Sequence, residues 1–328
     1  MDDYEIQLGV DWGTWKCAIS YALSHRGERV GSVSPVLMSG MAHEVPMMAT
    51  WHDGKFVHGF ALEALADKIP DVGDKIITLF KLPLYRDEET SDITATVQDI
   101  LSDLPGDKTL DMLIAEHLRA VVGEAKEAIC QSEELMKFNK DELHQLLKRA
   151  RVRVTVPQMW TLDARRRMQI AAKNAGLNLV TLASEPKCAL AYLVDKIAQQ
   201  KIPLNRRLGK GSLWMVADLG SGTGDFVVYT LLDTLSIDSH LRPVGHASGD
   251  LCGSSKVDEL LWHTLVKREG GDQWADECAE RLQISTRDFE RRSRRAIERA
   301  KSKLCDRGYY VETVQGVGRR HVAISFTK

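Results

Sequence analysis

The sequence lacks the features that mark membrane, secreted and metal-cluster proteins. No uncharged apolar run approaches the roughly 18 residues of a transmembrane helix, and the acidic start MDDYEIQLGV has no signal-peptide pattern. The six cysteines form no Cys-x-x-Cys pair, and no Asn-x-Ser/Thr acceptor occurs. We therefore expect a cytoplasmic protein with reduced thiols and no membrane partner.

The sequence also lacks an excess of charge of either sign. Forty-four Lys and Arg against 46 Asp and Glu give a net charge of -2, which provides no overall attraction to nucleic acid or anionic lipid. With 44% hydrophobic and 27% charged residues, the composition is that of a globular protein. Its 328 residues suggest two domains at about 150 residues each.

The order of apolar patterns predicts an α/β fold, because strand-like and helix-like segments alternate. Strands are expected at 4–10, 16–23, 152–156, 177–182, 213–216 and 226–232, a hairpin at 45–57, and a final β-pair at 310–314 and 322–326. Helices are expected at 110–131, 140–150, 161–175 and 285–305, with another opening at Pro186, and residues 86–108 are expected to be a surface loop. The polar stretch 200–212 is the predicted boundary between lobe I (1–199) and lobe II (212–328).

An internal repeat is the most informative feature of the chain. LGVDWGTWKCAISY near the start and MVADLGSGTGDFVVYTL about 200 residues later each contain a strand, an Asp at its end, a Gly/Thr turn and a second strand. Glycines in such turns let backbone N–H groups approach phosphate oxygens. Asp11 and Asp218 at the strand ends suit water-mediated Mg²⁺ coordination. The repeat predicts a nucleotide held by its phosphates between two hairpins.

Two other phosphate motifs do not fit. The glycines at 220, 222 and 224 precede a predicted strand, whereas the dinucleotide fingerprint opens a helix. The segment Leu208–Ser212 lacks the upstream glycine and the Lys-Ser/Thr pair of a P-loop.

With this repeat, the sequence resembles the actin-like ATPase superfamily (a ribonuclease H-like, two-lobed α/β fold), and within it the DnaK-type 70-kDa heat-shock proteins. The segment from Val154 to Val194, with its Val-Pro, Ala-Gly-Leu and Glu-Pro-x-x-Ala-Leu-Ala-Tyr pieces, resembles the family's connecting segment. Ser248–Gly253 resembles the loop beside the family's second phosphate hairpin.

The resemblance implies ATP or ADP and Mg²⁺ as ligands, and co-chaperones or client proteins as partners. It implies that Lys81, Glu185 and Asp218 are catalytic, and that Asp11 and Asp218 hold Mg²⁺ through water. The nucleotide-binding residues that it implies are Asp11, Gly13, Thr14, Gly220, Gly222, Thr223, Gly253, Glu298 and Lys301.

The chain departs from the family pattern at several positions. Trp15 and Lys16 replace small polar residues, Ser221 and Gly224 alter the second hairpin, and Ser302 replaces an arginine that stacks on adenine. These departures resemble the divergent member-12 type and its fungal relatives. The chain ends at Lys328, before the family's last adenosine motif, which predicts an incomplete second lobe.

Several functions therefore stay open. The leading hypothesis is an ATP-binding domain, an ATPase if the adenosine segment is supplied. A non-hydrolysing binding or interaction module is the second, and a sugar kinase of the same fold is the third. The Arg-rich helix 285–305 leaves nucleic-acid binding as a less favoured fourth.

Overall fold

The computed structural model describes a mixed α/β protein. It covers residues 3–38, 42–85, 91–177, 179–199, 210–232, 241–250, 252–307, 309–316 and 320–327. The chain forms two compact units: unit 1 combines Met1–Met47 with Leu79–Leu251, and unit 2 combines Met48–Thr78 with Cys252–Lys328. Most of the predicted boundary 200–212 lies outside the described residues, and the lobes 1–199 and 212–328 stay a prediction.

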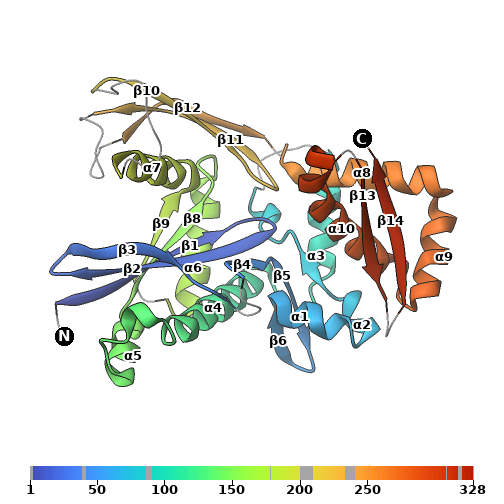
Figure 1. The fold of residues 1–328 in the computed structure, drawn as a ribbon, viewed down its shortest axis with the longest axis horizontal. Coiled ribbons are helices and arrows are strands. Elements are labelled where there is room, and N and C mark those ends of the chain that lie inside the picture. Colours follow the sequence, from blue (N-terminus) through green and yellow to red (C-terminus); the bar gives the residue numbers. More distant parts are fainter. Residues whose placement is uncertain are drawn as a thin grey trace. The chain divides into compact units, whose positions relative to one another are not determined.

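The main sheet of unit 1 has six strands, in the order β3-β2-β1-β8-β9 with β4 added beside β2 (Figure 1). These strands are β1 (Tyr4–Trp12), β2 (Lys16–His25), β3 (Glu28–Pro35), β4 (Glu44–Pro46), β8 (Arg151–Val156) and β9 (Leu179–Ser184). β1 is central: it pairs antiparallel with β2 and parallel with β8. The first predicted hairpin is therefore confirmed, and its first strand lies in the middle of a sheet.

Alternation along β1 explains its central place. Ile6, Leu8, Val10 and Trp12 are at most 1% exposed, and they lie on one face because successive side chains point to opposite sides of a strand. Trp12 Nε1 donates to Nδ1 of the fully buried His117, 3.2 Å away. This bond fixes the end of β1 against the helix that carries His117.

Three of the described helices of unit 1, α4, α5 and α6, begin at a side-chain cap. The described helices of this unit are α3 (Ser91–Ser102), α4 (Leu110–Ile129), α5 (Lys140–Lys148), α6 (Leu162–Asn174) and α7 (Glu185–Ala198), with short 3-10 turns η1 (Leu82–Leu84) and η2 (Glu133–Leu135). Thr109 and Thr161 accept backbone N–H bonds at the starts of α4 and α6, and Asn139 forms a capping box with Glu142 at α5. The prediction of a loop over 86–108 is wrong for 91–102, where Ile93, Val97 and Ile100 repeat at helical spacing in α3.

A second sheet of unit 1 consists of β10 (Leu213–Leu219), β11 (Gly224–Leu231) and β12 (Leu241–Asp250), all antiparallel. Helix α7 lies between β9 and this sheet (Figure 1), and Leu190 and Val194 pack on Val227 and Tyr229. Within the described chain β10 pairs only with β11, so it is an edge strand.

Unit 2 combines a small sheet with helices. Its elements are β5 (Met48–His52), β6 (Lys55–His58), β7 (Ile77–Thr78), α1 (Gly59–Ala66), α2 (Pro70–Gly73), α8 (Ser254–Glu269), α9 (Asp272–Leu282), α10 (Thr286–Arg307), β13 (Tyr309–Gln315) and β14 (His321–Thr327). The predicted hairpin at Asp53-Gly54 is confirmed, with φ of 49° and 73°. Trp262, Trp274 and Phe289 make edge and tilted ring contacts in the core.

Arginines of α10 stabilise unit 2. Arg292 donates to Asp288 (2.8 Å), to Asp67 (2.6 Å) and to the carbonyl oxygens of Ala66 and Gln315 (3.0 and 3.1 Å). Asp288 is fully buried. Because Arg292 meets four partners from three segments, it connects α10 with α1 and β13.

Replacing Arg292 with alanine should lower the free energy of opening of α10 by about 3 kcal/mol, because the change leaves Asp288 and Asp67 short of their partner. Hydrogen exchange of the α10 amides measures this locally. The control is Arg294→Ala on the same helix, whose more exposed pair with Glu290 should cost less than about 1 kcal/mol. Equal losses in the two variants would contradict the role of Arg292.

Candidate functional site

The two predicted hairpins have the same closing geometry. In the first, Asp11 pairs with Ala18, Trp12 with Cys17, and the Gly13 N–H donates to the Lys16 carbonyl oxygen at 3.1 Å. A methyl group on Gly13 would lie 2.6 Å from that oxygen, so the turn requires glycine there.

In the second hairpin, Asp218 pairs with Asp225, Leu219 with Gly224, and the Gly220 N–H donates to the Thr223 carbonyl oxygen at 2.8 Å. The matching bonds make Gly220 the equivalent of Gly13 and Asp218 the equivalent of Asp11. When the two hairpins are aligned by these closing bonds, Thr223 corresponds to Lys16 rather than to Thr14. The two threonines therefore do not occupy equivalent positions of the repeat.

The two turns meet through Thr14 and Gly222. A methyl group on Gly222 would lie 2.6 Å from Thr14 Oγ1 and 3.2 Å from a Leu82 methyl carbon, so this contact also requires glycine. Thr14 and Thr223 are buried. Unit 1 thus brings the predicted residues of both hairpins into direct proximity.

A buried ion pair lies at the same place. Lys81 is 2% exposed, immediately before η1, and its Nζ lies 2.7 Å from Oε1 of Glu185, the first residue of α7. Burial acts to lower the pKa of the Lys81 ammonium, but the Glu185 carboxylate raises it above its ordinary value. Lys81 is therefore charged at neutral pH. Its Nζ also lies 5.7 Å from the centre of the Trp160 ring.

Further carboxylates surround this pair. Burial raises the pKa of Glu185, and the charges of Asp11 and Asp218 raise it further, against the lowering effect of Lys81. Burial and Asp11 raise the pKa of Asp218 in the same way. Thr155 Oγ1 donates to Asp11 Oδ1 at 3.0 Å. These electrostatic effects mean that Asp11, Glu185 and Asp218 lie near one another in unit 1.

Asp225 belongs to this site, and the sequence analysis missed it. It is 1% exposed, its Oδ1 has no hydrogen-bond partner among the described residues, and Oδ2 accepts from Thr223 Oγ1 at 3.4 Å. Burial and the charge of Asp218 raise its pKa. The available signal was its position directly after the second glycine turn, opposite Asp218 in the register.

Neighbouring residues enclose Asp225. Residues 248–250 were expected to form a loop, but they end strand β12 instead, and a methyl group on Gly249 would lie 3.1 Å from Asp225 Oδ1. Tyr85 is buried beside Thr223, with 3.4 Å between the hydroxyl oxygens, and burial raises the pKa of Tyr85 to about 12. Tyr85 is thus a neutral hydroxyl at the second hairpin.

The donor set of the site suits a hard cation. Its groups are carboxylate and hydroxyl oxygens, which Mg²⁺ prefers, and Asp225 Oδ1 has no hydrogen-bond partner among the described residues. Within the described residues, no three His, Cys, Asp or Glu side chains lie close enough to ligate a metal together. If Mg²⁺ binds here, Asp11 and Asp218 at the two strand ends would hold it through its waters.

The other three predicted residues lie in unit 2. Gly253 is the N-cap of α8, and Lys301 on α10 reaches that helix, where its Nζ lies 2.6 Å from Oδ1 of the buried Asp258. Burial raises the pKa of Asp258, Lys301 lowers it and Glu298 raises it. The structure thus brings Gly253, Glu298 and Lys301 together around Asp258, a residue that the prediction did not include.

Comparisons with known proteins give a distant relationship. No family model matches the chain. The chain is similar to a "Chaperone protein HscA homolog" from each of two strains of Acidithiobacillus ferrooxidans, at 25% identity over 244 residues. The match covers 72% of this chain and 36% of each relative, so the chain spans about a third of their length. Within the described residues, no helix is both long and apolar enough to cross a bilayer.

Replacing Asp225 with asparagine should stabilise unit 1 by about 1 kcal/mol at pH 7, because it removes a buried carboxylate with an unpaired oxygen. Since the folded-state pKa of Asp225 is raised, the wild type gains stability as the pH falls through that pKa, and the variant does not. The advantage of the variant should therefore shrink toward pH 4. Denaturant unfolding at several pH values measures it, and an advantage that grows on acidification contradicts the assignment.

Proposed function

We propose that the chain is a divergent nucleotide-binding domain of the 70-kDa heat-shock-protein type, with a two-lobed actin-like ATPase fold. It would hold ATP or ADP with Mg²⁺ by the phosphates, between the turns at Gly13 and Gly220. The observation that carries this proposal is the pair of hairpins with the same closing bond and a carboxylate at each strand end, beside a buried lysine.

Each residue of the site has a separate part in this proposal. The backbone N–H groups of the two turns would bind phosphate oxygens, which only glycine-containing turns can approach closely. Lys81 would neutralise charge on the terminal phosphates, and Glu185 would hold the Lys81 ammonium in place. Mg²⁺ supplies charge neutralisation when bound, and Asp11 and Asp218 would orient its waters.

The relatives support the class of function. They are named as HscA-type chaperones, which agrees with a domain of a chaperone-like protein. The chain spans 36% of the length of these relatives. We propose that it acts with client proteins and co-chaperones and that it hydrolyses ATP. We also propose a cytoplasmic location and the member-12-like or fungal type.

In unit 2, Glu298 and Lys301 would form one wall of an adenosine pocket. Lys301 is held by Asp258 and is 22% exposed, so its aliphatic stem, rather than its charge, would contact a base. We therefore propose that affinity comes mainly from the phosphates and Mg²⁺, with little preference for adenine.

A non-hydrolysing binding module is the second candidate. It is favoured by the direct contact of Thr14 with Gly222 and by the pairing of Lys81 with Glu185, because both occupy the groups that a terminal phosphate would need. A sugar kinase is distinguished by measuring phosphate transfer with and without sugars.

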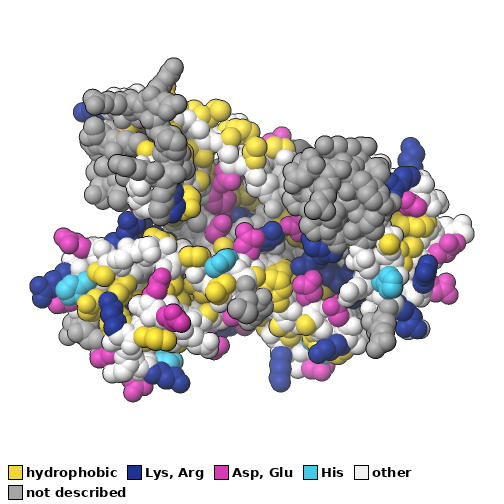
Figure 2. Space-filling view, in the orientation of Figure 1, with side chains coloured by type: hydrophobic (Ala, Val, Ile, Leu, Met, Phe, Trp, Pro, Cys, Tyr) yellow, Lys and Arg dark blue, Asp and Glu magenta, His cyan; other side chains and the backbone are white. Residues whose placement is uncertain are grey.

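Nucleic-acid binding is disfavoured because arginines on α10 form ion pairs within the protein. Arg291 and Arg292 bind Asp288, Arg294 binds Glu290 and Arg295 binds Glu63. On the face shown in Figure 2, Lys and Arg side chains are interspersed with Asp and Glu over the described surface. Such a surface offers no basic track for a phosphate backbone.

Replacing Asp218 with asparagine should weaken Mg²⁺-ATP binding about tenfold, because one anchor of the ion's waters is lost. Binding of ATP without metal should stay equal or improve, because the variant removes a negative charge from the phosphate site. Calorimetry with Mg²⁺ and with EDTA measures both, and Asp11→Asn should behave alike. The control is Asp163→Asn at the exposed start of α6. Equal losses with and without Mg²⁺ would exclude a metal role.

Replacing Lys81 with alanine should reduce ATP turnover by about a hundredfold, while the nucleotide Kd changes only a few-fold, because Lys81 acts on charge that develops during phosphoryl transfer. Phosphate release by the full chain measures it. The control is Lys75→Ala, an exposed lysine six residues earlier. Unchanged turnover would remove Lys81 from the mechanism.

A further inference from the structure

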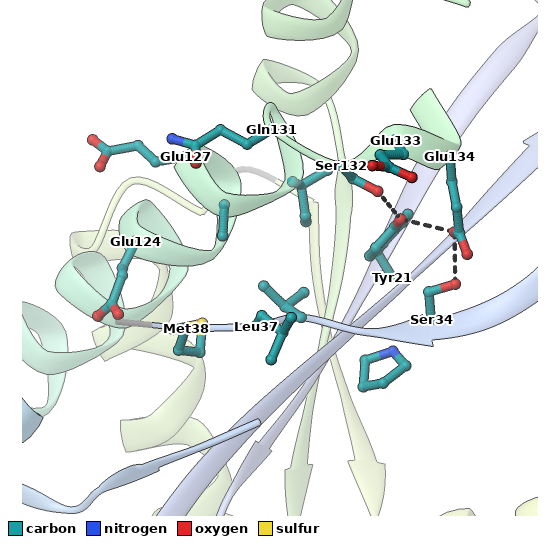
Figure 3. A pocket seen from close by; sticks show the side chains of 14 residues that line it. Tyr21, Ser34, Leu37, Met38, Glu124, Glu127, Gln131, Ser132, Glu133 and Glu134 are labelled. Carbon is teal, nitrogen blue, oxygen red and sulfur yellow. Dashed lines mark hydrogen bonds between the residues drawn. The ribbon is translucent and has the colours of Figure 1, made fainter. Parts of the chain in front are cut away.

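A groove of unit 1 contains none of the candidate nucleotide-binding residues, and its two walls differ in chemical character. It has a volume of about 740 Å³, within the range of roughly 300 to 1,000 Å³ that ligand pockets occupy. One wall is the segment 35–38, from the last residue of β3 onward, and the other is the C-terminal half of α4 with η2 (Figure 3). We call it the acidic groove.

The α4 wall carries charge of one sign. Glu124, Glu127, Glu133 and Glu134 line the groove, and none of its described lining residues is Lys, Arg or His. Glu127 and Glu133 are exposed and have no ion-pair partner among the described residues. Coulomb attraction therefore favours an occupant with positive charge.

One glutamate is held in position by hydroxyl groups. Glu134 Oε2 accepts from Tyr21 at 2.9 Å and from Ser34 at 2.7 Å, and Ser132 lies 2.8 Å from the Tyr21 hydroxyl (Figure 3). Burial raises the pKa of Tyr21, which keeps this donor protonated. These bonds connect β2 and β3 with η2, so the floor of the acidic groove is ordered before any partner binds.

The opposite wall is apolar and contains one prominent side chain. Leu37 is 50% exposed, whereas its neighbours Val36 and Met38 are at most 3% exposed. An exposed leucine beside unpaired glutamates suits a partner with an apolar side chain next to a basic one. A free inorganic cation would gain nothing from Leu37.

The backbone of this wall does not favour the addition of another strand. Val36 N–H donates to Ile19 O at 2.8 Å, and Met38 N–H donates to Ala42 O at 2.9 Å. Pro35 has no N–H to offer. Recognition at this wall therefore depends on side chains.

We propose that the acidic groove is a docking site for a segment of a partner protein that carries lysine or arginine beside a leucine-sized apolar residue. The basic side chain contacts Glu127 and Glu133, and the apolar residue covers Leu37. This inference is independent of the proposed nucleotide site, because none of the groove residues belongs to it.

The test uses a fluorescein-labelled peptide of alternating leucine and lysine, with fluorescence anisotropy as the measurement. The double variant Glu127→Gln/Glu133→Gln should bind it about tenfold more weakly, and Leu37→Ser about fivefold more weakly. All three residues are exposed, so these changes leave the fold intact. A peptide with glutamate in place of lysine should not bind. Glu134 is left unchanged because of its structural bonds.

The control double variant Asp107→Asn/Glu280→Gln removes the same charge at exposed positions outside the groove, and it should change the affinity less than twofold. If this control loses as much affinity as Glu127→Gln/Glu133→Gln, the attraction is general and the proposal is wrong. The proposal also fails if the peptide does not bind at micromolar concentrations. Displacement by spermidine together with an unchanged affinity of Leu37→Ser would identify a small-cation site, and would overturn peptide docking.

Discussion

The balance of charge around Lys81 constrains the whole candidate site. This ammonium is buried, and its partner Glu185 is in turn surrounded by Asp11 and Asp218. Neither the lysine nor the glutamate could stay ionised there alone, because burial opposes both charges. Since η1 follows Lys81 and α7 begins at Glu185, the pair also fixes the start of both elements beside the hairpins.

The two hairpins are similar because each contains the same short sequence pattern. A strand-end aspartate followed two residues later by glycine permits a tight turn that is closed by one backbone bond. Their surroundings differ: β1 has β8 on its free side, whereas β10 has no further neighbour among the described strands. Leu213, Met215 and Leu219 on β10 are between 66% and 71% exposed.

Features that depend on local sequence could be predicted. The turns at Gly13 and Gly220, the caps at Thr161 and the hairpin at Asp53 follow from residues within a few positions of one another. The central position of β1 could not be predicted in this way, because it depends on pairing with a strand more than 140 residues away.

The sequence did not predict which residues of the site contact one another or which of them are buried. Asp225 was missed because its position beside the second turn does not by itself show that its side chain is buried. The pairing of Lys301 with Asp258 joins residues 43 positions apart, so it needs the packing of α10 on α8. The role of Lys81 came only from the family resemblance, since a single lysine has no sequence pattern that predicts burial.

The net charge of -2 conceals how differently the charges are arranged in the two units. In unit 2, arginines of α10 form ion pairs with Asp288, Asp67 and Glu63, so this Arg-rich helix stabilises the fold of the unit. In unit 1, the carboxylates around Lys81 outnumber the positive charge that they meet, and Asp11 and Asp218 raise the pKa of neighbouring carboxyl groups. Paired charges stabilise a fold, whereas an unbalanced group is costly unless it has a ligand to offset it. The imbalance near the two hairpins is therefore the physical reason to expect a cation there together with the phosphates that it would accompany.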